Sequence, residues 1–105
     1  MNTKLEYLYR DAGNNKRWGD VIFTNNKAIS LRRIELMLRD VLIDNEFFVA
    51  KQSGLPELSF QKLDQDLDHD WYEYSELNNT TEQDNDLYNR DITDFIRLLK
   101  KTSNK

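Results

Sequence analysis

The fold is decided by residues 5–23, which read LEYLYRDAGNNKRWGDVIF. Two runs of aromatic and aliphatic residues flank a polar segment with glycines and asparagines, which is typical of two antiparallel strands joined by a turn longer than two residues. Side chains alternate between the faces of a strand, so the first run presents Leu5, Tyr7 and Tyr9 on one face and Glu6, Leu8 and Arg10 on the other. A hairpin is marginally stable alone, so the rest of the chain must cover its apolar side.

Two amphipathic helices are predicted to provide this cover. Apolar residues recur at helical spacing over residues 30–43, directly behind Ser30, whose hydroxyl is suited to cap a helix. A second stripe follows Asp91, at the spacing i, i+3, i+4 and i+7, and consists of Ile92, Phe95, Ile96 and Leu99. Both stripes are expected to pack on the same face of the sheet.

Three further strands are predicted, over residues 46–50, 57–63 and 71–77, and the last two are expected to form a hairpin around an acidic turn at 64–70. Residues 78–89 are polar and acidic and predict a mobile loop, and residues 102–105 predict a tail. The sequence therefore predicts one α+β domain over residues 1–105. It has a small antiparallel sheet in the order β-β-α-β-β-β-α and two helices packed on one face.

Composition excludes several classes of function. The 105 residues contain no cysteine, which excludes disulfides, thiolate zinc sites and cysteine nucleophiles. Neither a secretory signal core nor a membrane-spanning run is visible, so we expect a cytoplasmic protein. No glycine-rich phosphate loop, nucleophile elbow or zincin motif is present, and we expect no cofactor and no enzymatic activity. The oligomeric state is left open.

The charge of −4 is unevenly distributed along the chain. Residues 1–51 carry nine bases and seven acids, residues 52–89 one base and ten acids, and residues 90–105 five bases and two acids. An acidic surface attracts basic partners and accelerates their association. The leading hypothesis is a non-enzymatic protein that binds a basic, nucleic-acid-handling protein partner, with inhibition as one form. The predicted contact residues are Asp64, Asp66, Asp68, Asp70, Trp71 and Glu73. A solvated acidic loop is the alternative interpretation, and direct binding of nucleic acid is disfavoured because no basic stripe is present.

The acidic tract also raises metal and catalytic hypotheses. Asp64, Asp66 and Asp68 have the spacing that opens a calcium-binding loop, but the sixth position is His69 instead of glycine, and strands are predicted to flank the tract. A loose divalent-metal site would use Asp66, Asp68 and His69. An alternative function is a metal-dependent, hydrolase-like enzyme around His69, with Asp68 and Glu73. A solvated or structural histidine is the default.

The polar end of the hairpin suggests another alternative, a nucleotide or small-molecule binding site. A tryptophan beside basic residues can stack on a base or anchor a protein partner. The residues of this predicted site are Tyr9, Arg10, Asn14, Lys16, Arg17 and Trp18. The competing interpretation is that Trp18 folds back onto the edge of the core while Lys16 and Arg17 remain in solvent.

Several short segments carry a resemblance that covers residues 5–99. They are Tyr7-Leu8-Tyr9-Arg10-Asp11-Ala12 with Asn14, Lys16 and Gly19, then Phe47-Phe48, Gly54-Leu55-Pro56-Glu57-Leu58, and Asp68-His69 through Trp71 and Glu73. Together they resemble a widespread set of small stand-alone bacterial and phage proteins. In that pattern a second histidine precedes the glutamate, whereas Tyr72 occupies this place here. The resemblance implies one compact domain and no particular activity.

Overall fold

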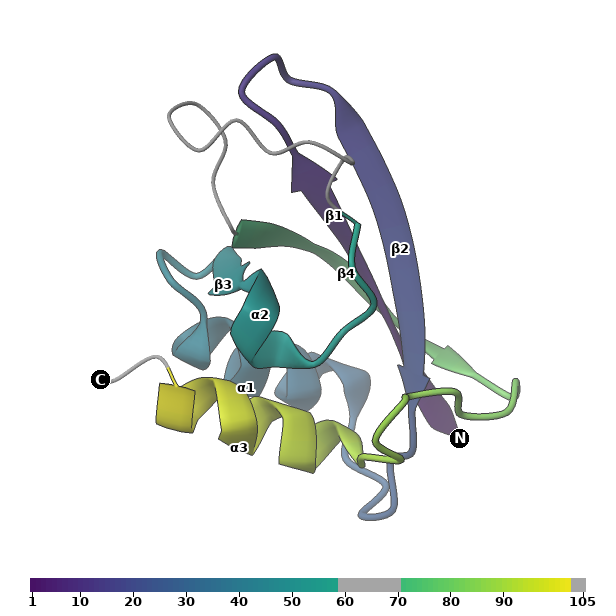
Figure 1. Cartoon of the computed structure of the whole chain (residues 1–105). Helices are drawn as coiled ribbons and strands as arrows, with labels where there is room; N and C mark the ends of the chain where they lie inside the picture. The colour runs from purple at the N-terminus through teal and green to yellow at the C-terminus, as the bar shows by residue number, and fades with distance from the viewer. Residues whose placement is uncertain (59–70, 103–105) are drawn as a thin grey trace.

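The computed structural model describes residues 1–58 and 71–102 of the chain. Its elements, in chain order, are β1 (Asn2–Arg10), β2 (Lys16–Phe23), α1 (Leu31–Val41), β3 (Phe47–Val49), α2 (Ala50–Ser53), β4 (Trp71–Thr80) and α3 (Ile92–Thr102). The four strands form one antiparallel sheet in the order β2-β1-β4-β3. Figure 1 shows the helices on one side of this twisted sheet, which confirms the predicted α+β class.

The predicted hairpin is β1 and β2, and its inner face forms the centre of the core. Leu5 lies opposite Val21, and Thr3 lies opposite Phe23. The alternate β1 side chains that face the helices, from Thr3 to Tyr9, are at most 1% exposed. In the turn, Asn14 adopts a left-handed φ of 64°, and the Asn15 N–H donates to the Asp11 carboxylate at 2.8 Å. Asparagine tolerates this backbone conformation better than most residues do.

Both predicted helices begin directly after their predicted capping residues, Ser30 and Asp91. The Arg33 N–H donates to the Ser30 hydroxyl at 3.3 Å at the start of α1, and the Thr93 N–H donates to the Asp91 carboxylate at 3.1 Å at the start of α3. The predicted stripe of α3 is fully in the core, where Phe95 stacks on Phe23 at 4.9 Å between ring centroids. Helix α1 ends at Val41, two residues earlier than predicted.

The predicted strands after α1 need correction. The strand expected at 46–50 is limited to Phe47–Val49, because the chain turns directly into the short helix α2. Of the strand expected at 57–63, residues 57 and 58 are not in a strand, and residues 59–63 lie outside the described residues. Its predicted hairpin with 71–77 is wrong at Tyr72 and Glu73, because these residues pair with β1 on one side and β3 on the other.

A β-bulge in β4 explains why the alternation of its side chains changes along the strand. Glu76 lies opposite Glu6, whereas Tyr74 lies opposite Tyr7, so that Ser75 is an extra residue. Tyr74 and Leu77 are therefore three residues apart and both buried. The bulge keeps both ends of β4 in contact with the core despite the break in period two.

The segment after α2 lies against the inner face of the hairpin. Gly54 ends α2 with a φ of 70°, which glycine adopts without strain. The Tyr7 hydroxyl donates to the Pro56 carbonyl at 2.8 Å, and the Leu58 N–H donates to the Tyr72 hydroxyl at 2.9 Å. Three of the segments that carry the resemblance thus meet in space.

The loop predicted at 78–89 starts later, because β4 continues to Thr80. It is fastened to the edge of β2, where the Ile22 N–H donates to the Asn85 side chain at 2.8 Å and the Asn85 N–H donates to the Ile22 carbonyl at 3.0 Å. Arg90 then pairs with Asp86 at 2.8 Å. The mobility of this loop stays a prediction. Within residues 1–58 and 71–102, no helix has the length and apolarity needed to cross a membrane.

Candidate functional site

Three carboxylates lie in a row across the sheet face that is turned away from the helices. On β1, Glu6 has Asp20 of β2 as its partner on one side and Glu76 of β4 as its partner on the other. We call these three residues the carboxylate row. Asp20 and Glu76 are exposed and Glu6 is half-buried. Like charges directly opposite one another destabilise a sheet, so the fold carries this row at an energetic cost.

The carboxyl groups of the row interact with one another. A hydrogen bond with Glu76 raises the pKa of Glu6 above its usual value, and partial burial and the charges of Glu76 and Asp20 act in the same direction. Lys4 lowers this pKa, but its ammonium lies 3.8 Å from the Glu82 carboxylate, with which it forms an exposed ion pair. A cation placed over the row would relieve the repulsion between these carboxylates.

Next to the carboxylate row, a second row of side chains crosses all four strands. Leu8 is the partner of Trp18 on one side and of Glu73 on the other, and Phe47 is the partner of Glu73. Leu8 is only 3% exposed, whereas Trp18 is 59% exposed. Beside this row, Trp71 is 39% exposed and lies 5.7 Å from Phe47 between ring centroids. We call this surface, formed by the two rows and Trp71, the outer sheet face.

Arg10 and Glu73 form the ion pair of the outer sheet face. The Arg10 Nε lies 2.9 Å from Glu73 Oε1, and its Nη2 lies 3.2 Å from Oε2, which is a two-point contact. A third guanidinium nitrogen donates to Asn14 at 2.5 Å. Glu73 raises the pKa of Arg10 through this hydrogen bond. The pair joins the hairpin turn to β4 and leaves the Arg10 charge neutralised.

The predicted small-molecule site is divided by the sheet. Tyr9 is 1% exposed and belongs to the inner face, and Arg17 is its partner on β2. Lys16 and Trp18 belong to the strand instead of the turn, and they alternate with Arg17. The structure brings Arg10 and Asn14 together but does not gather all six residues around one space.

The predicted acidic contact set is placed only in part. Trp71 and Glu73 lie on the outer sheet face, whereas Asp64, Asp66, Asp68 and Asp70 lie outside the described residues. His69 also lies outside them, so the metal set of Asp66, Asp68 and His69 and the hydrolase hypothesis stay predictions. Among the residues that are described, no three histidine, aspartate or glutamate side chains are arranged to hold a metal ion.

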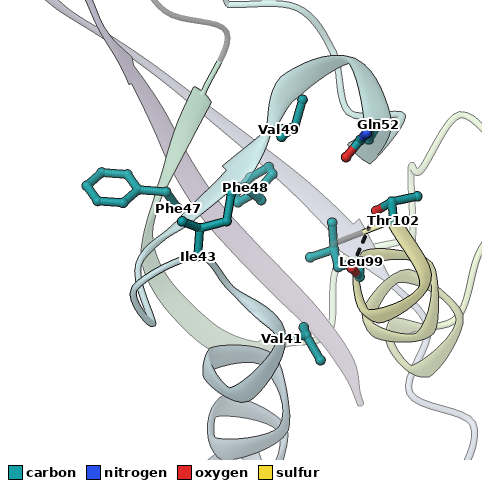
Figure 2. Close-up of a pocket in the computed structure, with 8 residues that line it drawn as sticks. All are labelled: Val41, Ile43, Phe47, Phe48, Val49, Gln52, Leu99 and Thr102. Carbon is teal, nitrogen blue, oxygen red and sulfur yellow. Dashed lines mark hydrogen bonds between the residues drawn. The ribbon is translucent and has the colours of Figure 1, made fainter. Parts of the chain in front are cut away.

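A small cavity lies near the end of α3 and does not suit a ligand. Val41, Phe48 and Leu99 are among its lining residues, and its volume is about 10 Å³, close to the minimum for one water molecule. Figure 2 shows the Phe47 side chain pointing away from Leu99 and Thr102, in keeping with its place in the outer row. We therefore assign the outer sheet face as the candidate site.

The carboxylate row was not predicted from the sequence. Strand alternation placed Glu6 on the face opposite the core, but Asp20 and Glu76 become its neighbours only through the register of two strand pairs. The register of β4 also includes a bulge, which has no clear pattern in the sequence. No protein-family model, curated protein or solved structure matches this chain.

Proposed function

We propose that this protein binds a basic protein partner through its outer sheet face. The observation that carries the proposal is the carboxylate row beside an exposed tryptophan, Trp18. Adjacent carboxylates that repel one another are suited to accept lysine or arginine side chains, because one cation is attracted by more than one carboxylate and reduces the repulsion between them. Within the part of the chain that the structure describes, no lysine or arginine forms an ion pair with the row, so its carboxylates can accept cations from a partner.

The aromatic residues of the same face would supply most of the affinity. Tryptophan is enriched among residues that dominate binding energy, and its ring also attracts cations. Trp18 and Trp71 lie on the two sides of the Arg10–Glu73 pair, and Leu8 lies between Trp18 and Glu73. The face thus combines exposed aromatic rings with an ion pair between them and the carboxylate row beside them.

Basic surfaces are characteristic of proteins that handle nucleic acid, and these are the partner class that we propose. The ten acids of residues 52–89 favour such a partner electrostatically. One concrete form of the function is inhibition, in which this protein occupies the nucleic-acid channel of its partner. Nucleotide binding at the hairpin turn is less well supported, because the Arg10 guanidinium already faces the carboxylate of Glu73.

The test is a pull-down from bacterial lysate with the tagged 105-residue chain, treated with nuclease and read by mass spectrometry. Wild type and Asp40→Lys are compared with Glu76→Lys and Trp18→Ala. Asp40 is an exposed residue of α1, so its reversal matches the charge change of Glu76→Lys away from the outer sheet face. The proposal expects one basic protein with wild type and Asp40→Lys, and its loss with the other two variants.

Salt provides a second readout of the same experiment. Because the proposed contacts are charge pairs near the surface, recovery of the partner should fall as sodium chloride rises from about 50 to 300 mM. Full recovery with Glu76→Lys at low salt would exclude the carboxylate row from the interface. Loss of the partner after nuclease treatment would show that nucleic acid bridges the two proteins.

A further inference from the structure

A groove with basic rims lies between α1 and α3, on the helical side of the molecule. Its volume is about 500 Å³, and its lining residues come from both helices and from the connection before α1. They are Lys27, Ile29, Arg33, Met37, Thr93, Ile96, Arg97 and Lys100. Figure 1 shows the two helices side by side on the same face of the sheet. The proposed interface on the outer sheet face does not include any of these residues.

The groove follows both helices because its residues repeat at helical spacing. On α1, Arg33 and Met37 are four residues apart, and Ile29 lies in the connection just before this helix. On α3, the four lining residues follow the pattern i, i+3, i+4 and i+7, which is one face of a helix. Ile29, Met37 and Ile96 provide an apolar floor, and the basic residues lie on both sides of it.

The charges of the groove have one sign. Four of its eight lining residues are lysine or arginine, and none is acidic, although the chain as a whole carries a charge of −4. Lys27 and Arg33 form no ion pair with any residue that the structure describes. Arg97 has a long contact of 3.4 Å with Asp94, between side chains that are 70% and 49% exposed. Such an exposed pair is weak and competes poorly with a bound anion.

We infer that this groove binds an acidic amphipathic helix of a second protein. An open groove between two helices accepts a third helix by the same packing of ridges into grooves that holds the first two together. Apolar side chains of the incoming helix would cover Ile29, Met37 and Ile96, and glutamate or aspartate residues on its flanks would meet Arg33 and Arg97. Leu36, which is 64% exposed one turn after Arg33, adds apolar surface beside this path.

The molecule would then have two binding faces, and they would prefer partners of opposite charge. A basic partner would bind the outer sheet face, and an acidic helix would bind between α1 and α3, with the sheet and the core separating them. The protein would then be an adaptor that holds two partners of opposite charge. The groove is argued from its own residues, so it stands or falls independently of the outer sheet face.

The test uses a fluorescein-labelled 15-residue peptide with leucines at i, i+3, i+4 and i+7 and glutamates on both flanks. Its binding to the full chain is measured by fluorescence anisotropy at about 50 mM sodium chloride, a salt concentration at which surface charges are weakly screened. Arg33→Glu should weaken binding at least tenfold. Arg32→Glu is the matched control, since it reverses the neighbouring exposed arginine that does not line the groove, and it should change binding less than threefold.

Further measurements locate the binding site of the peptide on the protein. Met37→Asp should abolish binding of the peptide by placing a carboxylate in the apolar floor, and circular dichroism verifies that each variant is folded. Amide chemical shifts of the wild type should change along α1 and α3 and remain unchanged on β1 and β2. A version of the peptide with lysine in place of every glutamate should not bind here.

Four results would overturn the inference. They are absence of binding by the acidic peptide, equal binding by Arg33→Glu and Arg32→Glu, shifts confined to the strands, and binding of dodecanoate in the groove without binding of the peptide. The last result would reassign the groove to small amphipathic anions. None of these results depends on Glu76 or Trp18, so failure here and failure of the proposed function are distinguishable.

Discussion

The carboxylates of this chain fall into two groups whose environments are opposite. Asp86, in the middle of the connection between β4 and α3, and Asp91, at its end, are 4% and 7% exposed, and each accepts several hydrogen bonds. Glu6, Asp20 and Glu76 lie side by side at the surface of the sheet and face one another. The carboxylates of the first group are hydrogen-bonded to other groups of the fold. Among the described residues, no lysine or arginine forms an ion pair with the second group, which is why we place function there.

The difference is visible in the direction of the pKa shifts. Burial alone would raise the pKa of Asp86, but the hydrogen bonds and the charge of Arg90 outweigh it, so the pKa lies below its usual value. For Asp91, burial is outweighed in the same way by hydrogen bonds from Asn26, Thr93 and Thr24. The pKa of Glu6 is raised instead. The ionised form is therefore stabilised at Asp86 and Asp91 and destabilised at Glu6.

The largest loss of stability is expected for Asp86→Asn. The side chain of Asp86 is 1% exposed, and Arg90, its partner, also donates to the Ser53 carbonyl at 2.7 Å and lies over the rings of Phe23 and Phe95. Removal of the negative charge leaves a partly buried guanidinium without its counter-charge, which costs about 3 kcal/mol of unfolding free energy. Urea unfolding at pH 7 measures this change.

Asp40→Asn is the control for this variant, because Asp40 is exposed and the replacement should change stability by less than about 0.5 kcal/mol. The cost of Asp86→Asn should also shrink in acid. A carboxylate with a lowered pKa contributes its stability above the unfolded value of 3.8, and the contribution is lost as pH falls through the folded value. Equal stability of the two variants at pH 7 would contradict the assignment of Asp86 to the fold.

A smaller loss of stability is expected for Asp91→Ala. Asp91 caps α3 and also holds the end of the hairpin, since it accepts from the Thr24 hydroxyl at 3.0 Å and from the Asn26 N–H at 2.7 Å. Loss of a helix cap lowers the free energy of unfolding by roughly 0.5–2 kcal/mol. Because Asp91 makes additional hydrogen bonds, we expect a decrease of about 2 kcal/mol for this variant. Ser30→Ala provides the comparison, because Ser30 caps α1 through a single exposed bond of 3.3 Å. If the two substitutions cost the same, Asp91 acts only as a cap.

Glu6→Gln is expected to have the smallest effect on stability, and it should stabilise the protein instead of destabilising it. The substitution removes the central charge of the three in the carboxylate row and should stabilise the protein by roughly 0.2–1 kcal/mol at pH 7 and low salt. Because the pKa of Glu6 is raised, its cost to stability is present above the folded pKa and disappears below the unfolded value of 4.5. The gain should therefore vanish in acid and in about 1 M salt. A loss of stability at pH 7 would show that the carboxylate row is satisfied within the fold.

Local patterns made much of the fold predictable. The hairpin and the stripes of both long helices follow from alternation and helical spacing, and both caps are read from single residues, Ser30 and Asp91. The pairing of β4 was not predictable, because β1 is more than sixty residues away along the chain and the nearer segment 57–63 offers a similar pattern. The four-residue helix α2 is too short for its spacing to be recognised.

The candidate site was predictable only as separate residues. Trp18, Trp71, Arg10 and Glu73 were each selected from the sequence, but the contact between Arg10 and Glu73 joins positions 63 residues apart. The carboxylate row depends on two strand registers at once, and one of them contains the bulge at Ser75. Charge counted along the chain located an acidic stretch, whereas charge on a surface depends on which strands become neighbours.

The two hydrogen bonds between Asn85 and Ile22 have a consequence for assembly. An edge strand offers backbone donors and acceptors to any other extended chain, and sheets can grow from one molecule to the next in this way. At Ile22 the N–H and the carbonyl of β2 are both occupied by one asparagine of the same chain. Asn85 therefore occupies the groups with which a strand of a second molecule would pair at this end of β2. Asn85→Ala keeps the backbone N–H of residue 85 and removes the side-chain acceptor, so it should free the Ile22 N–H for such pairing.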